Sequence, residues 1–230
     1  MRLWRNFLNK FKYIDYINET LFNDLKNNER DLSIFSEFGF KNIIISIFDE
    51  NINENKLNNI NKLSNENIDY CLQINNDKIN EIYTIIKKYK SKIPYISLKS
   101  SNENTIRKAL EIKDINIIIP SSDNNIARCN QTIAKIAYQK NIIFCFEIEN
   151  ILKSNSYNKC KYISSVINMI DILRKYDVKF MLISNATSIF DFKDLYSITS
   201  ISKMLGFNDK ECSKKYRLEI MKLLFENNYK

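Results

Sequence analysis

Short runs of apolar, β-branched residues alternate along this chain with segments of helical period, and this alternation restricts the fold more than any other feature. Seven runs have the length of a strand, and several are apolar on both faces, as in parallel strands that are covered on both sides. They lie at residues 13–18, 42–48, 68–74, 93–98, 115–119, 142–148 and 179–184. Strands that alternate with helices form βαβ units, so the pattern predicts a parallel sheet.

Four segments between these runs carry apolar residues at helical spacing. They are residues 77–89, 124–140, 159–176 and 189–205. Gly206 follows the last of them, where a helix commonly ends in a left-handed conformation. Asn208 and Glu211 then predict a capping box at the start of a final helix. Residues 51–67 are polar and rich in Asn, and we interpret them as a thin surface helix or a loop.

The glycine content narrows the fold class further. The chain of 230 residues has two glycines, Gly39 and Gly206, which are too far apart for a dinucleotide fingerprint or a phosphate-binding Walker loop. Seven parallel strands without such a loop favour a closed or nearly closed α/β barrel over an open doubly wound sheet. We find no linker and no internal repeat, so we predict a single barrel-like domain over residues 12–230.

Several function classes are excluded by what the sequence lacks. There is no histidine, which removes Ser-His-Asp and Cys-His nucleophile systems and every His-ligated metal site. The five cysteines are scattered and form no CxxC motif, a pattern typical of reduced thiols in a cytosol-like compartment. No apolar run approaches the roughly 18 residues that a membrane span needs. We therefore expect a cytoplasmic protein without a membrane partner.

The first eleven residues form a basic, amphipathic N-terminal extension. The apolar residues Leu3, Trp4, Phe7, Leu8 and Phe11 share one helical face, and the basic residues lie elsewhere on the helix. We favour a terminal helix that packs on its own domain or frays. The alternative is a helix that binds a membrane surface or a protein partner, and deletion of residues 1–11 would abolish binding only in that case.

Acidic residues at the ends of the predicted strands suggest a second hypothesis. In a parallel barrel, functional residues follow the C-terminal ends of the strands. Asp15, Asp49, Asp123 and Glu147 occupy such positions, and carboxylates bind Mg²⁺ or Mn²⁺ without histidine. A carboxylate-metal phosphoesterase is therefore an alternative function. Strand-end carboxylates are more often caps or ion-pair partners, and we favour that interpretation.

The net charge points to a polyanionic partner. Lys and Arg number 35 against 27 Asp and Glu, which gives +8 at pH 7. A basic surface attracts nucleic acid mainly through phosphate contacts. Lys159 and Lys161 lie beside Tyr157 and Tyr162, a mixture of charge and aromatic rings that suits RNA. For any single lysine, a solvated helix face is the alternative.

The order of short motifs along the chain carries a family resemblance. The sequence has IDYIN within residues 13–18, EFGFKNIIIS at 37–46, INIIIP at 115–120, ARCN at 127–130 and KNIIFCFE at 140–147. It continues with KYDV at 175–178, ISNATS at 183–188, DFKD at 191–194 and KMLGF at 203–207. In this order and spacing, residues 12–207 resemble ribonuclease P protein component 3, the barrel-like subunit of archaeal and eukaryotic ribonuclease P.

The resemblance implies a TIM-barrel-like fold of the kind found in PHP phosphoesterases, without their His-rich metal centre. It implies a protein subunit of the ribonucleoprotein that removes the 5′ leader of precursor tRNA. The RNA subunit would supply the catalytic site and its Mg²⁺, so this chain would have no catalytic residue and bind no cofactor. The implied partners are the ribonuclease P RNA, precursor tRNA, protein component 2 in a heterotetramer, and other protein subunits.

The resemblance also implies a set of RNA-binding residues, since the basic positions of the family match basic residues of this chain. They are Arg128, Lys159, Lys161, Arg174, Lys175, Lys193 and Lys203.

Overall fold

The computed structural model of the chain describes residues 14–27, 34–40, 42–49, 52, 68–121 and 128–228. The predicted extension at residues 1–11, most of the Asn-rich segment 51–67 and Asp123 therefore lie outside the described residues.

Seven parallel strands form one sheet whose spatial order follows the chain from β1 to β7. They are β1 Ile14–Asn18, β2 Asn42–Phe48, β3 Ile68–Ile74, β4 Tyr95–Ser100, β5 Ile117–Pro120, β6 Ile143–Glu147 and β7 Phe180–Ile183. The two edges meet beyond β7, where the Asn185 N–H donates to the Tyr16 carbonyl at 2.8 Å and the Asn18 N–H donates to the Ala186 carbonyl at 3.1 Å. The sheet is thus a nearly closed barrel, as predicted.

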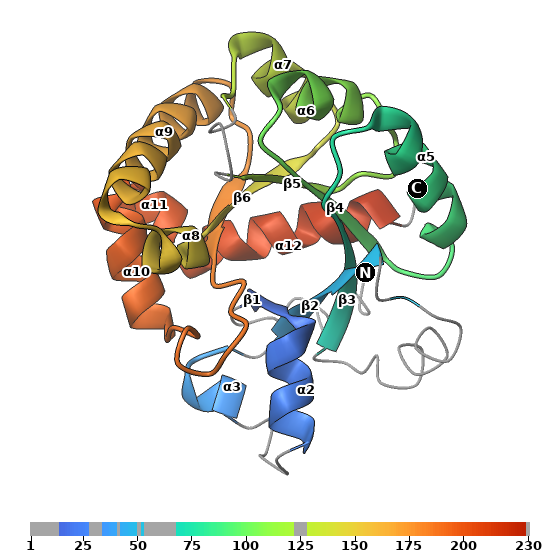
Figure 1. Cartoon of the computed structure of the whole chain (residues 1–230). Helices are drawn as coiled ribbons and strands as arrows, with labels where there is room; N and C mark the ends of the chain where they lie inside the picture. Colours follow the sequence, from blue (N-terminus) through green and yellow to red (C-terminus); the bar gives the residue numbers. More distant parts are fainter. Residues whose placement is uncertain are drawn as a thin grey trace, which may run out of the picture.

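Helices surround this barrel (Figure 1). The surrounding helices are α2 Glu19–Asn27, α3 Ile34–Glu37, α5 Ile79–Tyr89, α6 Glu103–Ala109, α7 Gln131–Gln139, α8 Ile148–Lys153, α9 Ser156–Lys175, α10 Leu195–Met204 and α11 Asp209–Cys212, and the chain continues into α12 Lys214–Asn228. No helix among the described residues is long and apolar enough to cross a membrane.

Two apolar layers result from the alternation of strand side chains. Outward residues such as Ile45, Leu72 and Phe144 form one core with the apolar stripes of the surrounding helices. Inward residues of the strands form a second, smaller core with α12. Figure 1 shows α12 crossing the ring of strands. The Tyr216 hydroxyl accepts from the N–H of Phe180, the first residue of β7, so α12 covers the N-terminal ends of the strands.

Side-chain caps set where several helices begin, and they correct the predicted boundaries. The helix predicted over 124–140 begins at Gln131, because the Asn130 side chain accepts from the Ile133 N–H. The helix predicted over 189–205 begins at Leu195, because Asp194 caps it through the N–H groups of Tyr196 and Ser197.

Two further predicted element boundaries can be compared with the structure. The predicted capping box of Asn208 and Glu211 is present, although it starts the four-residue α11 and the longer α12 follows. The run 142–148 was expected to be strand throughout, but Ile148 already begins α8.

Candidate functional site

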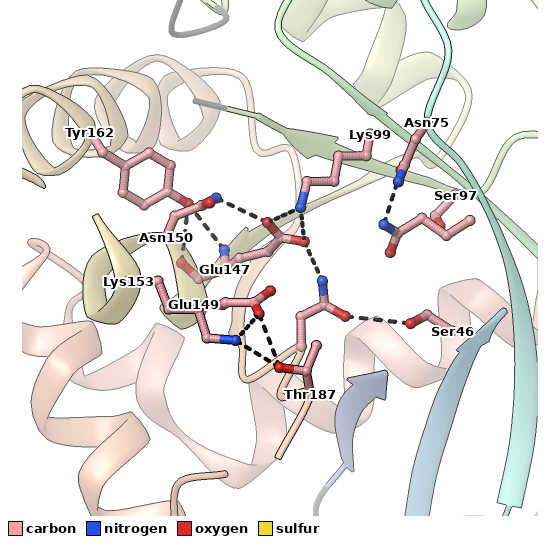
Figure 2. A network of polar contacts seen from close by, with 12 residues as sticks. Ser46, Asn75, Ser97, Lys99, Glu147, Glu149, Asn150, Lys153, Tyr162 and Thr187 are labelled. Atoms are coloured by element: carbon pink, nitrogen blue, oxygen red, sulfur yellow. Dashed lines mark hydrogen bonds and ion pairs between the residues drawn. The ribbon is translucent and has the colours of Figure 1, made fainter. Parts of the chain in front are cut away.

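A polar network crosses the mouth of the barrel at the C-terminal ends of the strands (Figure 2). Lys99 of β4 places its Nζ 2.8 Å from Oε2 of Glu147, the last residue of β6. The Asn185 side chain donates to Glu147 Oε1 at 2.5 Å and accepts from the Ser46 hydroxyl of β2 at 3.4 Å. Asn150 of α8 donates to Glu147 Oε2 at 2.9 Å. The Glu147 carboxylate thus joins β6 to β4, to α8 and to the loop after β7.

The Lys99–Glu147 ion pair is largely buried and has a structural role. The Glu147 side chain is fully buried and that of Lys99 is 18% exposed. Burial raises the pKa of Glu147, while Lys99 and the Asn185 amide act in the opposite direction. A buried ion pair is stable only when further hydrogen bonds satisfy it, and three side chains converge on this carboxylate. Its charge is therefore neutralised by the chain itself.

A second buried carboxylate lies at the seam where β1 approaches the end of β7. Asp15 Oδ1 accepts from the N–H of Ser184 at 3.0 Å and from its neighbour Tyr16 at 2.8 Å. The Ser184 hydroxyl donates to Asp15 Oδ2. Burial raises the pKa of Asp15 from 3.8 to about 6, against the lowering effect of these hydrogen bonds. Asp15 thus holds the seam closed.

The four carboxylates of the metal hypothesis do not form a common site among the described residues. Asp15 and Glu147 are bound to different partners, Ser184 on one side and Lys99 on the other. Asp49 follows β2, and Asp123 lies outside the described residues. Within the described part of the chain, no group of three or more Asp, Glu or Cys side chains is placed to hold a metal ion.

The predicted RNA-binding residues divide between the two ends of the barrel, because each surrounding helix returns antiparallel to its strand. Four follow the C-terminal ends of the strands, namely Arg128, Lys159, Lys161 and Lys193. Three lie in the last turns of α9 and α10, at the opposite end, namely Arg174, Lys175 and Lys203.

These basic residues also differ in whether they form ion pairs or hydrogen bonds within the protein. Arg174 contacts Glu211 through Nε at 2.8 Å, donates to the Gly206 carbonyl and pairs with Asp171. Lys203 pairs with Asp209 at 2.9 Å, and Lys193 donates to a backbone carbonyl. Arg174 thus ties α9 to α11.

The other four basic residues form no ion pair with any residue that the structure describes. They are Arg128, Lys159, Lys161 and Lys175.

The expected basic and aromatic cluster at the start of α9 is only partly present. Residues two apart on a helix are separated by about 200° of rotation, so Lys159 and Lys161 lie on opposite flanks of α9. Tyr157 is 75% exposed and available for contacts. The expectation for Tyr162 is wrong, because this side chain is fully buried and its hydroxyl accepts from the Glu147 N–H at 3.1 Å.

Sequence reasoning missed two other features of this region. Asn150, which donates to Glu147, lies in a helix that the strand pattern did not predict. Phe190 and Tyr196, on either side of Lys193 in the sequence, are 88% and 85% exposed. Their exposure was not predicted, because both lie in a segment that was assigned to an amphipathic helix, where an aromatic residue is expected to face the core.

Comparison with protein families identifies the relatives of this barrel. The family model described as RNase P subunit p30 matches residues 17–230. The chain belongs to this family. A member from Methanococcoides burtonii, ribonuclease P protein component 3, is 25% identical over 131 residues, which is 57% of this chain and 54% of that protein. The chain thus spans about half the length of this relative. A member of the same name from Methanococcus vannielii is 19% identical over 201 residues, 84% of this chain and 83% of that protein.

Solved structures share the fold. A chain in a cryo-EM structure of archaeal ribonuclease P with mature tRNA superposes with a TM-score of 0.75 at 15% identity, over 94% of this chain and 92% of that chain. Histidinol phosphate phosphatase from Lactococcus lactis, with zinc, L-histidinol and phosphate, gives a TM-score of 0.54 at 13% identity, over 86% and 95%. The family barrel is therefore of the same general type as that of a phosphatase.

Proposed function

We propose that this chain is a protein subunit of ribonuclease P, which supports removal of the 5′ leader from precursor tRNA by binding and stabilising the catalytic RNA. The family match over residues 17–230 carries the proposal. The structural relative from archaeal ribonuclease P comes from a complex that contains tRNA, in agreement with it. Chemistry would rest with the RNA subunit and its Mg²⁺. The partners would be that RNA, precursor tRNA, protein component 2 in a heterotetramer and other protein subunits, in the cytoplasm.

The mechanism follows from the distribution of charge. Folding of a large RNA brings phosphates together, and a cationic protein surface lowers their repulsion. Arg128, Lys159, Lys161 and Lys175 are the strongest candidates for this role, because their charges have no ion-pair partner among the described residues. Lys193 and Lys203 would add to the surface. For Arg174 we propose RNA contact only alongside its structural contact with Glu211.

A reconstitution experiment tests the proposal. The cognate RNA is assayed for cleavage of precursor tRNA over a range of Mg²⁺ concentrations, alone and with this chain plus protein component 2. We expect the proteins to lower the Mg²⁺ requirement, because they replace part of the cation shielding. An unchanged requirement would contradict the mechanism.

A companion assay addresses the phosphoesterase alternative directly. The purified chain alone is incubated with Mn²⁺ and a phosphoester substrate. Hydrolysis above the level of a Glu147→Gln variant would favour the alternative, whereas we expect none.

A further inference from the structure

A polar groove runs between the N-terminal end of α6 and the adjacent face of α9. It has a volume of about 1050 Å³, close to the upper end of the range for protein binding pockets. The lining residues that matter here are Asp77, Glu103, Arg128, Lys161, Ser164 and Asn168. We call this feature the α6–α9 groove. Its walls come from segments that follow β3, β4, β5 and β6, so it opens at the end of the barrel where sites are usually found.

Two of the cations that have no ion-pair partner among the described residues line this groove. Arg128 and Lys161 are separated by 33 positions in the sequence, yet both line it, and both are exposed. Neither forms an ion pair with a described residue, in contrast to Arg174 and Lys203. Two such charges in one concave site attract the phosphates of a nucleic-acid strand.

The α9 side of the groove offers regularly spaced hydrogen-bonding groups. Lys161, Ser164 and Asn168 are spaced i, i+3 and i+7 on α9 and therefore form one stripe along the helix. All three are exposed. A strand of nucleotides placed along this stripe would meet a cation first and then a hydroxyl and an amide, which suit a sugar or a base edge.

The opposite wall carries two carboxylates that each have one oxygen engaged. Asp77 Oδ1 accepts from the Ser100 hydroxyl, and Glu103 Oε1 accepts from the Asn130 amide. Their second oxygens have no hydrogen-bond partner among the described residues. A free carboxylate oxygen repels phosphate but accepts from a ribose hydroxyl, and the 2′-hydroxyl is the group that distinguishes RNA from DNA.

We propose that the α6–α9 groove binds a single-stranded RNA segment, with phosphates on Arg128 and Lys161 and ribose hydroxyls toward Asp77 and Glu103. A concave groove favours a single strand, because a duplex presents its phosphates on a convex surface. The inference rests on the proposed RNA-binding function and gives it a location, a strand type and a sugar preference.

Fluorescence anisotropy on the full-length chain tests the proposal. The probes are a labelled single-stranded RNA octamer, a DNA octamer of the same sequence and an RNA hairpin. Arg128→Ala and Lys161→Ala are compared with Lys87→Ala and Lys108→Ala, which remove exposed lysines outside the groove. Circular dichroism confirms that each variant is folded.

We expect each groove variant to lose about tenfold in affinity for single-stranded RNA, the equivalent of one charge-assisted hydrogen bond. The salt dependence should flatten by about one unit of slope for each cation removed. The control variants should bind as the unmodified chain does. The RNA octamer should bind more tightly than the DNA octamer, and Asp77→Ala should narrow that difference.

Three results would overturn the proposal for the groove, and none of them would by itself contradict the proposed ribonuclease P function. If the groove variants match the controls, RNA binds elsewhere on the chain. If RNA and DNA bind equally, or the hairpin binds best, the assignment of a single ribose strand is wrong. If the chain binds no octamer even at low salt, the groove is not an RNA site, and the reconstitution assay still decides the proposed function by itself.

Discussion

Replacement of Asp15 by asparagine tests how the barrel seam is held. Asp15 is fully buried, and its Oδ1 accepts from the N–H groups of Ser184 and Tyr16. An asparagine retains that oxygen, and its amide can donate to the Ser184 hydroxyl in place of the present bond to Oδ2. The substitution thus removes the ionisation and keeps the hydrogen bonds.

The sign of the effect follows from the pKa of Asp15, which folding raises from 3.8 to about 6. The folded protein therefore holds this proton more tightly than the unfolded chain does. Its contribution to stability is fully present below pH 3.8 and is lost as the pH rises through about 6. At about 1.4 kcal/mol for each pKa unit, the full contribution is about 3 kcal/mol.

The Asp15→Asn variant has no such pH dependence at this position. The free energy of unfolding of Asp15→Asn, minus that of the unmodified chain, should therefore rise by about 3 kcal/mol between pH 3.8 and pH 6 and then stay level. Urea unfolding at half-unit steps from about pH 3.5 to about pH 7.5 measures this difference. Asp209→Asn is the control, because Asp209 is exposed and its pKa is lowered by Lys203, so its difference curve runs the other way. A flat or falling curve for Asp15→Asn would refute the reasoning.

Substitutions at three ion pairs give further tests. Lys99→Met should lower the free energy of unfolding by about 3–5 kcal/mol, because it leaves Glu147 buried without its cation. The double variant Lys99→Met, Glu147→Gln should recover much of this free energy, because it removes the buried charge as well as its partner. Urea unfolding of the unmodified chain, the single variant and the double variant measures this, and a double variant as unstable as the single one would contradict the argument. Arg174→Ala should cost about 2–3 kcal/mol, because it breaks charged hydrogen bonds to a nearly buried carboxylate. Lys203→Ala should change thermal unfolding little, because its pair with Asp209 is exposed; equal losses for Arg174→Ala and Lys203→Ala would contradict this distinction.

The strands were predictable because their pattern is local. Runs such as 42–48 and 68–74 are apolar on both faces, and the structure forms strands with these same bounds. Helix starts were less predictable, because Asn130 and Asp194 end the preceding loop through their side chains, inside segments whose apolar period extends further back. The short helix α8 was missed because Ile148 continues the apolar run of β6 without a break.

The sequence indicates which residues lie at the ends of the strands, but it does not show which of them pair with one another. Lys99 and Glu147 are both strand-end residues, but they lie 48 positions apart, and only the strand register brings them together. The exposure of Tyr162 was wrongly predicted because its closest charged neighbour in sequence, Lys161, projects about 100° away from it around the helix, while Tyr162 itself points into the core. Sequence proximity on a helix does not mean a shared face unless the spacing is three or four.

The distribution of charge explains why a barrel of this type suits a binding role at its outer surface. At the mouth, Glu147 is neutralised by Lys99, and at the seam Asp15 is held by Ser184, so the buried carboxylates are already used within the chain. On the outside, Arg128 and Lys161 have no ion-pair partner among the described residues. Charges that are satisfied inside contribute to the fold, whereas exposed cations without partners remain available to an anionic ligand. We therefore expect variants at the mouth to change stability first, and variants in the α6–α9 groove to change RNA affinity at constant stability.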